Sequence, residues 1–178
     1  MLQRELTKRC GFTVLVDNRA VPGTYASQLL YGSPEYRGVP FEEFMSISTA
    51  DATIFAFGIN DALMKTAPES YRYHMYRLGE IARAHGKRVI FETPNPVAAL
   101  RANVPDWQRP WLDALVPLLS TVASSLGAPL VDQYSPYRDR DLALDPSFPD
   151  GIHPSQATAV EKAMRAADVA ERVICPRA

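Results

Sequence analysis

The spacing of apolar residues changes back and forth along the chain, and this alternation predicts an α/β domain. Short continuous apolar runs are typical of strands buried on both faces, and they cover 12–17, 52–57, 88–91 and 129–131. Elsewhere apolar residues recur every third or fourth position, which predicts helices over 25–31, 41–47, 70–85, 110–126 and from 154 onward. We therefore expect one three-layer α/β/α sandwich over residues 1–178, with a mostly parallel, flavodoxin-like sheet.

The first residues predict the last turns of an amphipathic helix. Leu2, Leu6 and Cys10 recur every fourth residue with charged residues between them, and Gly11 is a typical helix stop. No capping residue precedes Leu2. Because natural domains rarely start inside an element, we expect the domain to be incomplete at its N-terminus.

The composition is that of an ordinary globular protein, and the charge balance limits the kinds of binding partner to expect. Hydrophobic residues make up 47% of the chain, and 19 basic residues stand against 20 acidic ones. This balance gives no electrostatic reason to expect nucleic acid or an anionic surface as a partner. No apolar run is long enough for a membrane span, and no His, Cys or Asp group has the spacing of a metal site, so we expect neither metal nor cofactor. The oligomeric state stays open.

The two cysteines, Cys10 and Cys175, lie near opposite ends of the chain. Two free thiols suit a reducing compartment, and a single disulfide between them is the alternative. If Met1 is the true start, a cytoplasmic location is expected, because no signal peptide precedes the first helix. A missing N-terminal segment would leave export open.

Three polar turns follow predicted strands or the long loop after 131. They are Pro22-Gly23-Thr24, Gly58-Ile59-Asn60-Asp61 and Asp150-Gly151-Ile152-His153. In open parallel sheets the ligand site lies beyond the carboxyl ends of the strands. We therefore expect the three turns to converge on one rim.

Asp150 and His153 have the spacing of a carboxylate that orients an imidazole. Such a carboxylate can bond one ring nitrogen and leave the other free as a base. The alternative is a helix N-terminal region in which Asp150 is a partial cap. The Asn60 amide and the Gly23 N–H could likewise face a developing oxyanion, or the two turns could be structural only.

Taken together, the three turns resemble sequence blocks of the SGNH (GDSL-type) hydrolases, in the right order and over nearly the whole chain. The resemblance implies an ester substrate, His153 as general base, Asp150 as its orienting partner, and Gly23 with Asn60 as part of the oxyanion hole. The family's first block, Gly-Asp-Ser, carries the nucleophile on a strand before the first helix. Nothing in this sequence matches it. Neither Ser33 nor Ser155 is expected to replace that serine, because neither follows a strand as the block requires.

A missing nucleophile strand would also affect stability. By the resemblance it would run between 12–17 and 52–57, and burying its four to five apolar side chains would contribute on the order of 10 kcal/mol. We expect this chain to be poorly stable alone, or the two flanking strands to pair directly.

Two functional hypotheses follow. The first is an ester hydrolase acting in its complete form by a Ser-His-Asp mechanism. The second is a catalytically inactive remnant that binds a ligand or a partner chain. A flavodoxin-like ligand-binding module is a weaker third interpretation.

Overall fold

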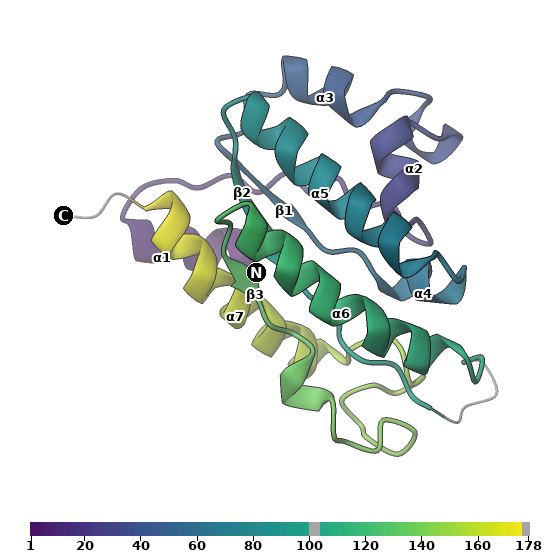
Figure 1. Cartoon of the computed structure of the whole chain (residues 1–178). Coiled ribbons are helices and arrows are strands. Elements are labelled where there is room, and N and C mark those ends of the chain that lie inside the picture. The colour runs from purple at the N-terminus through teal and green to yellow at the C-terminus, as the bar shows by residue number, and fades with distance from the viewer. Residues whose placement is uncertain (100–103, 176–178) are drawn as a thin grey trace.

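The structure is a computed structural model that describes residues 1–99 and 104–175. Its sheet has three parallel strands in the order β1 (Ala52–Phe55), β2 (Arg88–Glu92) and β3 (Leu130–Val131). Helices cover both faces, as Figure 1 shows. They are α1 (Leu2–Cys10), α2 (Ala26–Tyr31), α3 (Phe41–Ile47), α4 (Ile59–Leu63), α5 (Pro68–Ala84), α6 (Gln108–Ser125) and α7 (Gln156–Ile174), with short 3₁₀ turns at Pro34–Tyr36 and Ser135–Tyr137.

The predicted fold class is confirmed, and the ends of the predicted helices and of these three strands lie within two residues of the observed ones. Side chains of β2 alternate between two cores. Ile90 packs with Leu6 and the alanines of α7, whereas Val89 and Phe91 belong to the larger core under α5 and α6. This alternation is why a strand buried on both faces is apolar at successive positions.

The predicted strand at 12–17 is wrong. The segment is extended, as Figure 1 shows, but it belongs to none of the strands that the structure describes. Its backbone bonds to side chains of α1 instead: Val14 N–H donates to Thr7 Oγ1 (3.0 Å), and Val16 N–H donates to Gln3 Oε1 (2.9 Å). Leu15 is 81% exposed.

The segment does not pair with β1, and its Val14 and Val16 N–H groups bond side chains of α1 instead. In the described part of the chain, β1 pairs with β2 on one side and with no strand on the other. Direct pairing of 12–17 with β1, one of the two expected outcomes, therefore does not occur. An apolar run becomes a strand only where a neighbour accepts and donates its backbone hydrogen bonds.

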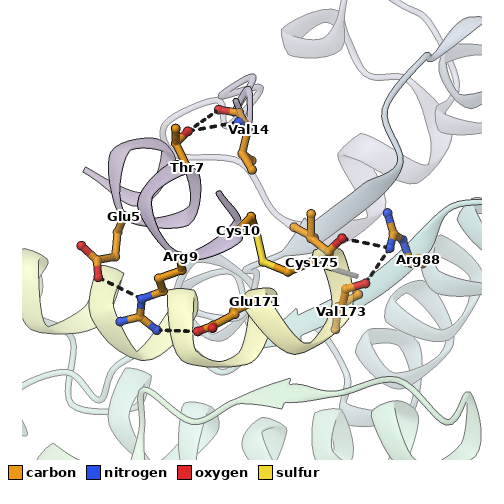
Figure 2. Close-up of a disulfide and its surroundings, with 10 residues drawn as sticks. Glu5, Thr7, Arg9, Cys10, Val14, Arg88, Glu171, Val173 and Cys175 are labelled. Carbon is orange, nitrogen blue, oxygen red and sulfur yellow. Dashed lines mark hydrogen bonds and ion pairs between the residues drawn. A yellow bond between two sulfur atoms is a disulfide. The ribbon is translucent and has the colours of Figure 1, made fainter. Parts of the chain in front are cut away.

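The expectation of two free thiols is also wrong. Cys10 and Cys175 form a disulfide, with their Cα atoms 5.1 Å apart, and it joins the end of α1 to the end of α7 (Figure 2). Arg9 strengthens the same contact, because its guanidinium bonds Asp168 at 2.6 Å and Glu171 at 3.2 Å. Residues at the two ends of the sequence are thus adjacent, a proximity that no count of cysteines could indicate.

None of the helices within 1–99 and 104–175 has the length and apolar character needed to cross a membrane.

Candidate active site

The Asp150–His153 turn places a carboxylate against an imidazole. Nδ1 of His153 lies 2.6 Å from Oδ2 of Asp150, and the backbone N–H groups of Ile152 and His153 both donate to Oδ1. The bond from the His153 ring, aided by these backbone donors, holds the pKa of Asp150 well below its usual value. The His153 side chain remains 79% exposed, so the ring is fixed on one side and open to solvent on the other.

Hydrogen bonds from neighbouring segments fix the backbone of the Asp150–His153 turn. Asn95, which is buried, donates from Nδ2 to the Ile152 carbonyl (3.0 Å), and Ala98 N–H donates to the Gly151 carbonyl (2.7 Å). Lys162 Nζ donates to Asn95 Oδ1 at 2.6 Å, which connects α7 to the same network. The peptide that carries His153 is therefore tied both to the segment after β2 and to α7.

Asn60 and the Gly23 loop form a second constellation. Asn60 Nδ2 donates to the Thr24 carbonyl at 3.0 Å. Gly23 has a φ of +77°, in the left-handed region that favours glycine, and a β-carbon placed there would meet no atom within 4 Å. The space beside Gly23 is therefore unoccupied by protein atoms. Thr24 is fixed by its side chain, because its Oγ1 bonds the Val21 carbonyl and the Tyr36 hydroxyl, each at 2.8 Å.

Asp61, next to Asn60, is a buried carboxyl group. It is 0% exposed, its Oδ1 accepts the Ala26 N–H (3.2 Å), and its Oδ2 has no hydrogen-bond partner in the described residues. Burial raises the pKa of Asp61 to about 7, and the backbone donors only partly oppose this effect. The carboxyl of Asp61 therefore stays protonated to a much higher pH than that of an exposed aspartate.

The segment after β2 contacts both groups of candidate site residues, the Asp150–His153 turn and the turn that carries Asn60. Pro94 packs on the Gly58 turn so closely that a β-carbon on Gly58 would lie 2.9 Å from Pro94 Cγ. The next residue, Asn95, holds the His153 turn through the Ile152 carbonyl. The described structure thus connects the two constellations through consecutive residues of one segment, although their functional roles remain predictions.

A cavity of about 240 Å³ lies beside Pro154, which follows His153. Leu2 at the start of α1 also lines it, together with Glu92, Lys162 and the α7 alanines 159, 163 and 166. Burial raises the pKa of Glu92 and lowers that of Lys162. The start of the first helix and the His153 turn therefore border one hollow.

The two alternative serines have structural partners. Ser155 caps α7, its Oγ accepting the Thr158 N–H at 3.3 Å, and Ser33 Oγ donates to Glu35 at 2.5 Å. Sequence reasoning assigned no function to Asn95, Lys162 or Asp61. Local signals existed for two of them, since Asp61 ends the Gly58–Asp61 turn and Asn95 lies between two prolines. Their roles could not be read from these signals, because the contacts of all three residues are with distant parts of the chain.

Residues 1–159 match the GDSL-like lipase/acylhydrolase family, and the chain belongs to this family, as its sequence blocks predicted. It is similar in structure to a lipase/acylhydrolase from Enterococcus faecalis, with 18% identity, a TM-score of 0.71, and coverage of 99% of this chain and 86% of the other. An acetylxylan esterase from Geobacillus stearothermophilus gives 18% identity, a TM-score of 0.70 and coverage of 99% and 80%. No match exists among the curated proteins. At such identities the structural likeness establishes the fold alone.

Proposed function

We propose that this chain is the greater part of a serine ester hydrolase in which His153 is the general base. One observation carries the proposal: in a chain of the acylhydrolase family, an exposed imidazole is held by a carboxylate at 2.6 Å. The bond to Asp150 fixes the ring orientation and stabilises the imidazolium that forms when the base takes a proton. An ester is the substrate class that such chemistry serves.

The reaction needs a nucleophile, and no Gly-Asp-Ser block is present in this sequence. We propose that it is the serine of a Gly-Asp-Ser strand that lies outside residues 1–178 and occupies the unpaired edge of β1. Two features support this placement. Phe12, Leu15 and Val16 leave apolar surface exposed on the 12–17 segment, which the added strand could cover. Leu2 at the start of α1 borders the same cavity as Pro154.

In the complete enzyme the serine hydroxyl attacks the ester carbonyl while His153 accepts its proton. The negative charge on the carbonyl oxygen is stabilised by the Gly23 N–H and the Asn60 amide. His153 then protonates the departing alcohol, which leaves an acyl-serine, and a water deprotonated by His153 releases the acid.

Hydrolysis of p-nitrophenyl acetate tests this proposal in two proteins, the 178-residue chain and the same chain preceded by a Gly-Asp-Ser strand. We expect activity in the extended protein, a fall of at least about 10³-fold in its His153→Ala variant, and little change in a matched His85→Ala variant. Undiminished hydrolysis without His153 would refute its role as the base.

The second candidate is a non-catalytic domain that binds a ligand or a partner chain. The observation in its favour is that Ser33 and Ser155, the serines considered as replacements, are engaged in local hydrogen bonds. This alternative predicts no hydrolysis even after a Gly-Asp-Ser strand is added to a folded protein.

A further inference from the structure

The Gly23 loop and the Asn60 turn are joined by two hydrogen bonds that run in opposite directions. Asn60 Nδ2 donates to the Thr24 carbonyl (3.0 Å), and Asp61 Oδ1 accepts the Ala26 N–H (3.2 Å). Two adjacent side chains of α4 thus grip a short stretch that begins one residue after Gly23. Two bonds to a rigid turn restrict rotation of the loop far more than one bond would.

The Asn60 bond also orients the amide itself. An amide nitrogen carries two hydrogens, and the bond to Thr24 occupies one of them. The amide cannot flip without losing this bond, so the direction of the second N–H is determined by where the loop lies. The position of the loop relative to α4 is in turn set by the bond between Ala26 and Asp61.

Burying a carboxyl group to accept that hydrogen bond carries a desolvation penalty. Asp61 is 0% exposed, and its Oδ2 has no hydrogen-bond partner in the described residues. A buried polar atom without a partner destabilises a fold, and an apolar residue of similar size would avoid the penalty. The hydrogen bond from the Ala26 N–H is the interaction that an apolar residue at position 61 could not make.

We propose that Asp61 is a positioning residue, which holds the Gly23 loop against α4 so that the Gly23 N–H and the free Asn60 N–H face the same point. The inference rests on the proposed function, because that point is where the ester's oxyanion forms. Asp61 itself is buried and does not touch the substrate. Its effect is expected to be substantial because a displacement of about 1 Å at a catalytic group can lower the rate about 10²-fold.

Amide hydrogen exchange of Ala26 tests the grip without requiring catalysis. In Asp61→Ala the acceptor is lost, and we expect this amide to exchange at least about tenfold faster. In Asp61→Asn the side-chain oxygen still accepts the bond, so protection is retained. Asp51→Ala removes an exposed aspartate at the start of β1 and serves as the matched control.

Two results would overturn the proposal. One is equal Ala26 exchange in Asp61→Ala and Asp51→Ala. The other is a uniform acceleration that includes the amides of α7, because this would report general destabilisation rather than release of one loop.

Kinetics of the extended protein provide the second readout. We expect Asp61→Ala to lower kcat by about 10- to 100-fold with KM changed by less than about threefold, and Asp61→Asn to restore most of the rate. A loss confined to KM would contradict a positioning role. If the extended protein hydrolyses no ester at all, the proposed function fails, whereas the exchange experiment still decides whether Asp61 holds the loop.

Discussion

Removal of the disulfide is the perturbation for which the structure gives the largest expected loss of stability. Cys10 and Cys175 are separated by 165 residues, so the bridge closes almost the whole chain into one loop. In the chain-entropy description, a cross-link destabilises the unfolded state by an amount that grows with the logarithm of loop length. For this loop the contribution is roughly 5 kcal/mol at 25 °C.

This amount is comparable to the ~5–15 kcal/mol that stabilises a typical domain. The remaining contacts between α1 and α7 include the burial of Leu6 and the ion pairs of Arg9. Arg9 contributes less than its bond distances suggest, because Asp168 and Glu171 are largely exposed and water screens such pairs. We therefore expect these contacts to offset only part of the loss.

The measurement is urea-induced unfolding, followed by circular dichroism, of the oxidised protein, the reduced protein and the Cys10→Ser/Cys175→Ser double variant. Reduction and the double substitution should lower the free energy of unfolding equally, and reductant should leave the double variant unchanged. The m-value should rise as well, because the unlinked chain exposes more surface when it unfolds. A difference below about 1 kcal/mol between oxidised and reduced protein would refute the loop-length reasoning.

Two further predictions concern the site. Burial raises the pKa of Asp61 to about 7, so its contribution to stability is fully present below its unfolded pKa of about 4 and is lost as pH rises through 7. Between pH 5 and pH 8 the loss should be about 2.5 kcal/mol, because pH 5 already lies one unit above the unfolded pKa. Urea titrations at these two pH values should show this part of the pH dependence disappear in Asp61→Asn, and an identical pH dependence in the variant would contradict the assignment. In Lys162→Met, buried Asn95 Oδ1 loses the donor at 2.6 Å, and we expect a loss of about 1–3 kcal/mol in the free energy of unfolding. Lys8→Met, on the exposed side of α1, is the control, and equal stability of the two variants would argue against the Asn95 network.

The elements that could be predicted from the sequence are those whose signal is local. Helix α3 (Phe41–Ile47) was placed without error, and α5 and α6 within two residues, because the period of apolar residues along a helix needs no knowledge of a partner. The segment 12–17 has an equally clear apolar run and is not a strand. Its hydrogen bonds depend on what lies beside it, which a periodicity cannot reveal.

The same distinction separates the parts of the candidate site. Asp150 and His153 are three residues apart, so their contact follows from a single turn. The bonds that support the site cross the chain: Asn95 is 67 residues from Lys162, and Ala26 is 35 residues from Asp61. Only the folded sheet brings these residues together, and their roles in catalysis remain predictions.

The disulfide also changes the stability expected from the sequence. That expectation considered only unpaired strand edges and the loss of a strand buried on both faces, and it did not include the contribution of a disulfide. A bridge between α1 and α7 restrains the unfolded chain without adding any contact at the open edge. Low stability is therefore the expectation for the reduced protein, and a cooperative unfolding transition is the expectation for the oxidised one. If oxidised and reduced chains were equally unstable, the unpaired edge of β1 would be the dominant defect, and addition of the Gly-Asp-Ser strand would be the change that stabilises the domain.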